Sequence, residues 1–149
     1  MSDLTQPWSG PYGGLPPLDI ATPEAIEAAA HKAIAEKRAE IAAIVANYDS
    51  VTFENTVKAF EDCGRACQRV FALYALFNAN KTGGTWPEVG PRLAAQFSSL
   101  DDEIAHDNGL FTRLFAVPEK GLSAELLRLK SVILDRMKRR GAGLPKAAC

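Results

Sequence analysis

Apolar residues recur along this chain at three- and four-residue steps, the spacing that places them on one face of an α-helix. The first helix is predicted to begin at Thr22-Pro23-Glu24, where a threonine N-cap, a proline and an acid stand in the positions typical of a helix start. It is predicted to end near Ala46. Its inward stripe consists of Ile26, Ala30, Ile34, Ile41 and Ile44, and the many alanines between them predict close approach by a neighbouring helix.

A second stripe predicts one continuous helix from a Thr52 cap to Asn80. Its inward residues are predicted to be Phe53, Val57, Phe60, Cys67, Phe71 and Tyr74. Gly64 falls on the same stripe, although glycine costs about 1 kcal/mol of helix propensity. We interpret it as the place where another helix crosses closely.

Residues 81–84 interrupt the pattern, and a third helix is predicted from Thr85 to about His106, with Val89, Leu93, Phe97, Leu100 and Ile104 inward. Pro91 predicts either a kink or a later start with Gly90 as the cap. A short helix over 108–117 follows. Ser123 caps the last helix, which ends at Gly141 and turns Leu126, Leu129, Ile133 and Met137 inward.

These elements predict an all-α fold, an antiparallel helical bundle of four main helices plus a short one, because short links join antiparallel neighbours. The helical domain is predicted to cover residues 22–149, after an extended Pro/Gly-rich N-terminal arm over residues 1–21. Trp8 and Tyr12 predict that this arm covers an apolar surface, either of its own bundle or of a neighbouring copy. Self-association is therefore one expectation.

Composition narrows the class of protein. With 47% hydrophobic and 23% charged residues, the chain is typical of a globular domain, and its net charge of −1 predicts neither nucleic acid nor a membrane surface as partner. No apolar run approaches the roughly 20 residues that span a bilayer. The first residues lack the features of a signal peptide, which predicts a cytoplasmic protein. Three cysteines do not suggest a disulfide framework.

Candidate metal ligands are few. The two histidines are His31 and His106, and neither belongs to an H-E-x-x-H motif, in which both rings face a zinc ion and the glutamate activates water. Glu103 and His106 match one half of a di-iron motif, but the other candidate pair, Glu27 and His31, has the wrong spacing. A solvated helix end is the interpretation we favour for His106. No metal ligand is predicted in this chain.

Other candidate chemistry also has structural interpretations. Cys63 and Cys67 lie four residues apart on the predicted second helix, where small core residues are expected. Cys149 is expected to be exposed. The basic run at Arg136, Lys138, Arg139 and Arg140 complements a helix dipole, and Gly141-Ala-Gly-Leu-Pro-Lys is predicted to be a helix C-cap rather than a nucleotide loop. The sequence therefore predicts no catalytic and no cofactor-binding residue.

Several segments together carry a family resemblance. They are Pro7-Trp-Ser-Gly-Pro-Tyr-Gly-Gly-Leu-Pro-Pro-Leu-Asp, Ile20-Ala-Thr-Pro-Glu, Arg38-Ala-Glu-Ile-Ala-Ala-Ile-Val-Ala-Asn, Thr52-Phe-Glu-Asn-Thr-Val, Pro91-Arg-Leu-Ala-Ala, Asn108-Gly-Leu-Phe-Thr-Arg-Leu and Gly141-Ala-Gly-Leu-Pro-Lys. In this order the chain resembles the N-terminal region of the thimet oligopeptidase family of zinc metallopeptidases. The bacterial peptidyl-dipeptidase (dipeptidyl carboxypeptidase) and oligopeptidase A branch is the most similar.

The resemblance implies a mostly helical fold and a wall of a deep channel that admits short peptides. It also implies that zinc and the H-E-x-x-H helix belong to the C-terminal part of longer family members, so no catalytic residue carries over. The chain departs from the family pattern at residues 81–90, where glycines and prolines interrupt the helix.

Two hypotheses follow. In the first, the chain is the N-terminal non-catalytic portion of a peptide-hydrolysing zinc metallopeptidase, inactive without a C-terminal catalytic portion as its partner. In the second, it is a stand-alone helical peptide-binding or protein-interaction module without catalysis.

Overall fold

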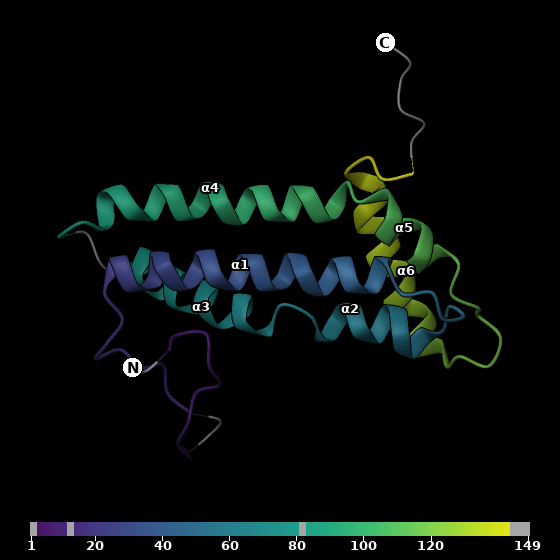
Figure 1. The fold of residues 1–149 in the computed structure, drawn as a ribbon, viewed down its shortest axis with the longest axis horizontal. Helices are drawn as coiled ribbons and strands as arrows, with labels where there is room; N and C mark the ends of the chain where they lie inside the picture. Colours follow the sequence, from purple (N-terminus) through teal and green to yellow (C-terminus); the bar gives the residue numbers. More distant parts are fainter. Residues whose placement is uncertain (1–2, 12–13, 81–82, 144–149) are drawn as a thin grey trace, which may run out of the picture. The chain divides into compact units, whose positions relative to one another are not determined.

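A computed structural model describes residues 3–11, 14–80 and 83–143. Within these ranges the regular elements are helical and no strand occurs, which confirms the all-α prediction. The helices are α1 (Pro23–Val45), the π-helical turn η2 (Glu54–Lys58), α2 (Ala59–Asp62), α3 (Arg65–Asn80), α4 (Trp86–Ala105), α5 (Asn108–Phe115) and α6 (Ala124–Arg139) (Figure 1). None of the helices in the described ranges is both long and apolar enough to cross a membrane.

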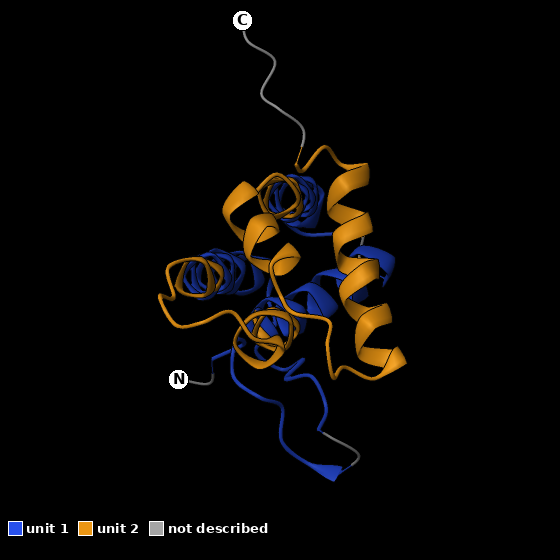
Figure 2. Cartoon of the chain, turned by 90° about the vertical axis from the view of Figure 1, so that its right-hand side faces the viewer, with its two compact units in different colours: residues 1–40, 64–98 blue, residues 41–63, 99–149 orange. Residues whose placement is uncertain are grey.

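The chain divides into two compact units (Figure 2). The first unit contains residues 1–40 and 64–98, and the second contains residues 41–63 and 99–149. Each unit is therefore built from two segments that are far apart in the sequence. The division falls inside α1 and inside α4, so each of these helices contributes one part to each unit.

The first unit is built on the N-terminal part of α1, α3 and the N-terminal part of α4. Consecutive helices alternate in direction (Figure 1), which confirms the predicted antiparallel arrangement. The predicted inward residues of α1 and α4 are buried, apart from Ile104, which is half-buried. Ala30 and Ala33 have no exposed surface. These small side chains allow the close helix contact that the alanine content predicts. The buried residues of this unit include Ile26, Ile34, Val70, Leu73, Phe77, Trp86, Val89, Leu93 and Phe97.

The predicted continuous helix over 53–80 is wrong, because the chain breaks at Cys63-Gly64. The Cys63 backbone is extended, with φ −74° and ψ 156°. Gly64 has a φ of +72°, which residues with a side chain rarely adopt. The Gly64 amide donates to Glu40 Oε2 at 2.6 Å. A Cβ on Gly64 would lie 2.6 Å from Cδ of Lys37, so glycine also allows a close approach to α1.

The break resets the phase of the following helix. In α3 the inward positions are Cys67, Val70, Leu73 and Phe77, whereas Phe71 is 48% exposed and Tyr74 is half-buried. The sequence pattern predicts Phe71 and Tyr74 inward, on a stripe that continues from Phe53. Because α3 begins after a non-helical turn, it presents a different face, and the prediction for Phe71 is wrong. The half-buried Tyr74 still packs its ring against those of Trp86 and Phe97.

Aromatic rings join α3 to α4 in the first unit. The Trp86 ring centroid lies 5.6 Å from that of Phe77 and 5.9 Å from that of Tyr74. The Phe97 ring meets that of Tyr74 at 5.5 Å and that of Phe71 edge-on at 5.1 Å. Centroid separations of this size are favourable for aromatic pairs, so these five residues form an aromatic cluster.

Helix α4 begins at Trp86 and continues through Pro91, so Gly90 is not its cap. A Cβ at Gly90 would lie 3.2 Å from Trp86 Nε1, which shows that the indole packs against this glycine. Residues 83 and 84 lie in a turn, and residues 81 and 82 fall outside the described ranges.

The predicted caps of three helices are confirmed. The hydroxyl oxygens of Thr22, Thr52 and Ser123 accept from backbone amides three residues later at 3.1, 3.1 and 3.3 Å. The side-chain oxygen of Asn55 accepts in return from the Thr52 amide at 2.9 Å, so this pair acts as a capping box.

The C-terminal end of α6 is also as predicted. Gly141 has a φ of +102°, its amide donates to the carbonyl of Lys138, and the Ala142 amide donates to that of Met137. This pair of bonds is a Schellman motif. It confirms that Gly141 is a helix cap, while residues 144–149, including Cys149, lie outside the described ranges.

The second unit has its own apolar core. Its buried residues come from the end of α1, from η2 and Cys63, from α5 and the loop after it, and from α6. They include Ile41, Ile44, Val57, Leu110, Leu114, Val117, Ile133, Leu134 and Met137. Asp107 caps α5 by accepting from the Leu110 amide at 2.9 Å. Arg113 of α5 donates to the carbonyl of Asn47, just after α1 ends.

Candidate functional site

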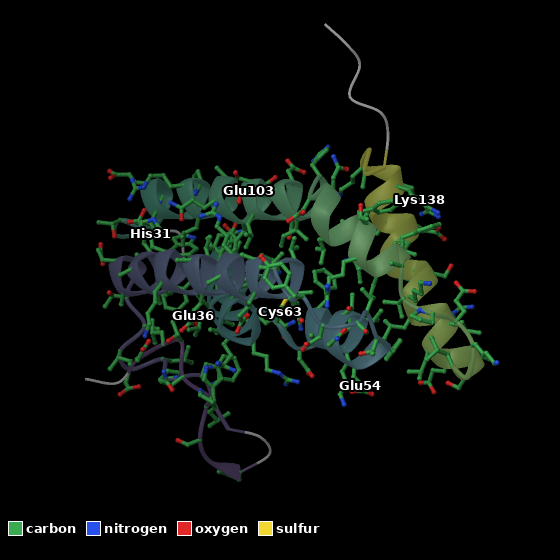
Figure 3. All side chains as sticks on the ribbon, turned by 45° about the vertical axis from the view of Figure 1, so that its right-hand side comes forward. His31, Glu36, Glu54, Cys63, Glu103 and Lys138 are labelled. Carbon is green, nitrogen blue, oxygen red and sulfur yellow. The ribbon has the colours of Figure 1, made fainter. Side chains whose placement is uncertain are left out.

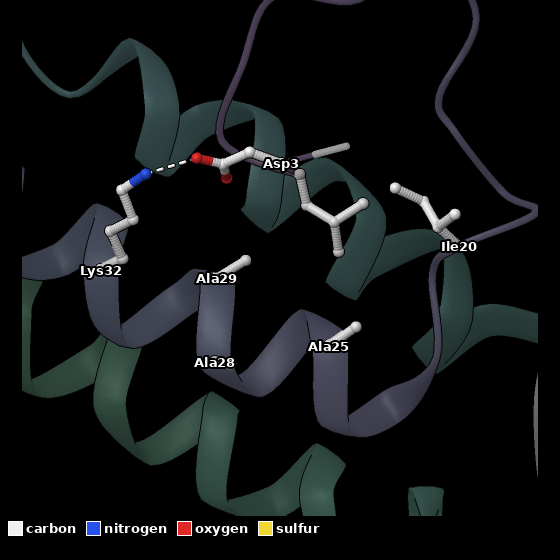
Figure 4. Close-up of a pocket in the computed structure, with 7 residues that line it drawn as sticks. Asp3, Ile20, Ala25, Ala28, Ala29 and Lys32 are labelled. Carbon is white, nitrogen blue, oxygen red and sulfur yellow. Dashed lines mark hydrogen bonds and ion pairs between the residues drawn. The ribbon is translucent and has the colours of Figure 1, made fainter. Parts of the chain in front are cut away.

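A pocket of about 540 Å³ lies between the N-terminal arm and the first turns of α1 (Figure 4). Its floor is apolar, because α1 presents alanines there, and the arm adds two branched side chains and one acid. The lining residues are Asp3, Leu4, Ile20, Ala25, Ala28, Ala29 and Lys32. All of them belong to the first unit. The pocket is therefore an apolar hollow with a charged pair, Asp3 and Lys32, at its edge.

Hydrogen bonds hold the start of the arm in place. The Asp3 carboxylate accepts from Lys32 Nζ and also from the amide and hydroxyl of Thr5 at 2.9 and 2.7 Å. The Thr5 carbonyl then accepts from Nε and Nη2 of Arg69 in α3, at 3.0 and 2.7 Å. Leu4, between them, is 4% exposed. Residues 3–5 are thus fixed to both α1 and α3.

Trp8 and Tyr12 are the two aromatic residues of the arm. Trp8 is half-buried within the first unit. Tyr12 lies outside the described ranges. The covering of an apolar surface by both rings therefore stays a prediction, as does self-association.

The charges of the pair at the pocket edge are well defined. The hydrogen bond from Lys32, with those from Thr5, holds the pKa of the Asp3 carboxyl well below its ordinary range. The same hydrogen bond to Asp3 raises the pKa of the Lys32 ammonium. At neutral pH Asp3 is consequently a carboxylate without a proton to give, and Lys32 is an ammonium without a free lone pair. The pocket therefore combines an apolar floor with an ion pair in which each charge stabilises the other.

Replacing Asp3 with asparagine is expected to loosen the arm, because the ion pair with Lys32 is lost. We expect chymotrypsin to cleave after Trp8 several-fold faster than in the unmodified chain, measured by mass spectrometry. Asp19→Asn, which removes an exposed acid from the same arm, is the control. Equal cleavage rates for the two variants would show that the ion pair does not hold the arm.

The ion pair between Asp3 and Lys32 is expected to weaken at low pH and again at high pH. Because the Asp3 pKa is lowered on folding, its contribution is complete above its unfolded pKa of about 4 and is lost as pH falls through the lower folded value. Because the Lys32 pKa is raised, its contribution is complete below its unfolded pKa of about 10.4 and is lost above the folded value. Protection of the arm should therefore be constant between about pH 5 and pH 9.

Glu27 and His31, the pair with the wrong spacing for a di-iron motif, are both hydrogen-bonded to α4. Figure 3 labels His31 on α1. His31 Nε2 lies 2.8 Å from Nε2 of Gln96 in α4, and Glu27 binds the Arg92 guanidinium through both carboxylate oxygens at 2.8 and 3.0 Å. This bond lowers the Glu27 pKa. Together with the bond from the Thr85 hydroxyl to Glu24, these pairs form a polar seam between α1 and α4.

Glu103 and His106 are likewise engaged at the end of α4. Nδ1 of His106 lies 2.7 Å from the Asp102 carbonyl, one turn earlier in the same helix. Glu103 accepts from the Ser99 hydroxyl at 3.3 Å. Among the residues that the structure describes, no group of three or more His, Cys, Asp or Glu side chains is placed to hold a metal ion. The donor set that a zinc ion requires is not assembled in these ranges.

Cys63 and Cys67 are buried thiols, in agreement with their interpretation as core residues. They do not share one helix face, because Cys63 ends α2 and Cys67 lies in α3 beyond the turn at Gly64. In the basic run, Arg140 pairs with Asp102 at 3.3 Å. Arg136, Lys138 and Arg139 occupy the last turn of α6, where positive charge complements the helix dipole.

Lys130 is a residue whose role the sequence interpretation missed. It lies on the inward face of α6 with 4% of its surface exposed. Its ammonium donates to the Val117 carbonyl at 2.7 Å and to Glu119 Oε1 at 3.1 Å, which fastens the loop before α6 to that helix. A lysine four residues after Leu126 and three before Ile133, on an apolar stripe, was the available signal.

Comparison with known proteins decides the relationship. The chain is 34% identical over 116 residues to the dipeptidyl carboxypeptidase of Escherichia coli strain K12, a match that covers 75% of this chain and 17% of that enzyme. It is 32% identical over 115 residues to the dipeptidyl carboxypeptidase of Salmonella typhimurium strain LT2, with coverages of 74% and 17%. The chain is a homologue of dipeptidyl carboxypeptidase.

This homology confirms the family resemblance inferred from the sequence. No family model matches the chain. The chain spans about one sixth of the length of the two dipeptidyl carboxypeptidases, 17% in both cases. The similarity thus concerns a limited part of those enzymes.

Proposed function

We propose that this dipeptidyl carboxypeptidase homologue is the N-terminal, non-catalytic helical portion of a zinc metallopeptidase, and that it forms a wall of the channel through which short peptides reach the catalytic portion. One observation carries the proposal. The chain matches dipeptidyl carboxypeptidases over three quarters of its length, yet it contains no H-E-x-x-H motif. A segment of this kind contributes shape to an enzyme whose chemistry resides elsewhere in the polypeptide.

The described residues support a structural role. Both histidines face hydrogen-bonding partners, and the charged pair at the pocket edge is held in its ionised form. In the complete enzyme, zinc would polarise the peptide bond and activate water, with ligands from the catalytic portion. As its relatives' name indicates, that enzyme would release dipeptides from the C-termini of short peptides.

A chimera tests this proposal. The matched segment of the Escherichia coli enzyme is replaced by the corresponding residues of this chain, and hydrolysis of a short peptide is followed with and without a chelator. We expect chelator-sensitive activity within about tenfold of the parent enzyme, because the catalytic portion is unchanged. The isolated chain should show none. A soluble but inactive chimera, or metal-dependent turnover by the isolated chain, would contradict the proposal.

The stand-alone peptide-binding module is the second candidate, and the pocket between the arm and α1 is the observation that favours it. Titrating short peptides into the isolated chain by calorimetry separates the two. Micromolar binding together with an inactive chimera would support the module. Weak or absent binding with an active chimera would support the peptidase portion.

A further inference from the structure

The outward face of α3 is apolar. Five residues at helical spacing are exposed there, namely Phe71, Ala72, Ala75, Leu76 and Ala79. Phe71 is 48% exposed and Leu76 is 40% exposed. Helix α3 carries no charged side chain over residues 70–80. We call these five residues the α3 apolar face, and they form a continuous strip along the side opposite Val70 and Leu73.

The exposed side of α1 in the same unit has a different composition. It carries four charged side chains, Lys32, Glu36, Arg38 and Glu40, beside the exposed alanines Ala28, Ala35 and Ala39. Charged side chains of this kind are what a solvated helix normally presents to water. The contrast within one unit indicates that the α3 apolar face is made for contact with another surface.

The chemistry of the face favours a helix over a bound peptide. An extended peptide needs hydrogen-bonding groups for its backbone, and the middle of the α3 apolar face offers none. The exposed amide side chains of α3 are Gln68, before the face begins, and Asn78 and Asn80, near its C-terminal end. Ala72, Ala75 and Ala79 instead provide a shallow groove along the helix axis, which lets another helix approach closely. Phe71 and Leu76 flank that groove.

We propose that the α3 apolar face packs against an apolar helix in the remaining portion of the full-length peptidase. This inference rests on the proposed function. We assign the partner helix to the remainder of the peptidase because the match covers only 17% of the length of the relatives, so most of those enzymes lies outside it. An uncharged partner surface is required, since a charge facing the α3 apolar face would be desolvated without a counter-charge.

The test compares Ala75→Glu with Ala35→Glu in the chimera described above. Both positions are exposed alanines inside helices of the first unit, so the two changes carry the same small helix-propensity cost. We expect A75E to reduce the yield of soluble, active chimera about tenfold, because the carboxylate is buried at the new interface. A35E should leave the yield unchanged. In the isolated chain neither change should alter the thermal midpoint.

Two outcomes would overturn the inference. One is an active chimera in which A75E and A35E behave alike, a result that leaves the proposed function standing. The other is an isolated chain that sediments as a stable dimer and becomes monomeric with A75E, because a second copy would then be the occupant. Where the chimera is insoluble, the chain is added in trans to the Escherichia coli enzyme lacking the matched segment. Weaker binding of A75E than of A35E supports the inference, and equal binding overturns it.

Discussion

Replacing Trp86 with alanine is expected to lower the free energy of unfolding by about 3–5 kcal/mol, the range measured when a buried aromatic side chain is truncated. Trp86 is 4% exposed, and its ring packs against Phe77, Tyr74 and the surface of Gly90. Its removal leaves a cavity in the aromatic cluster that joins α3 to α4. Urea denaturation followed by far-ultraviolet circular dichroism measures the change, since helix content does not depend on the lost indole.

Tyr48→Ala is the matched control for Trp86. The Tyr48 side chain is fully exposed, with a relative accessibility of 102%. Its truncation removes an aromatic ring without making a cavity and should change the free energy of unfolding by no more than about 0.5 kcal/mol. Similar urea midpoints for the two variants would show that the aromatic cluster does not hold the first unit together.

Replacing Lys130 with alanine is expected to cost about 2–4 kcal/mol. The change removes a buried four-carbon stem and leaves the Val117 carbonyl without its donor. Because Lys130 also reaches Glu119, the loop before α6 loses both of its attachments to this residue. Loss of protection against hydrogen exchange in residues 116–123 should accompany the fall in stability.

Lys138→Ala is the control that separates the effect of losing a buried side chain from the effect of losing a positive charge. Lys138 lies in the last turn of the same helix and is exposed, so its loss removes a favourable dipole interaction of about 0.3–1 kcal/mol only. Lys130→Met keeps an apolar stem of similar length and reports the hydrogen bonds by themselves. Equal destabilisation by K130A and K138A would contradict the structural role of Lys130.

The sequence predicted the helices whose ends are set by local chemistry. Thr22, Thr52 and Ser123 begin helices by bonding to amides three residues away, and Gly141 ends one by adopting a positive φ. Such signals involve only neighbouring residues, so they can be recognised without knowledge of the tertiary fold.

The break at Gly64 could not be recognised in this way. The apolar spacing around it is compatible with a continuous helix, and a glycine on such a stripe is equally compatible with a close helix crossing. Tertiary contacts to α1 distinguish this position from a glycine inside a continuous helix. The Gly64 amide donates to Glu40, and the missing Cβ makes room for Lys37, both in α1. The predicted inward orientation of Phe71 is wrong for the same reason, because it depends on an unbroken helical phase.

The candidate site was predictable only in part. The absence of an H-E-x-x-H motif is a property of the sequence, and the resemblance to a peptidase family was carried by short motifs such as Thr52-Phe-Glu-Asn-Thr. The pocket was not predictable, because the Asp3 and Lys32 that border it are brought together by a turn of the arm. The same holds for the seam between Glu27 and Arg92, which are 65 residues apart.

The interleaved construction of the two units has a consequence for biosynthesis. The apolar stripe of α1 leaves the ribosome before residues 64–98, which complete the first unit. Residues 99–149, which complete the second unit, follow later still. At about 5–20 residues per second, adding residues 64–98 alone takes roughly 2–7 s. During that interval the nascent chain presents Ile26 and Ile34 to the solvent, and chaperones that bind apolar segments have time to engage it before either unit can close.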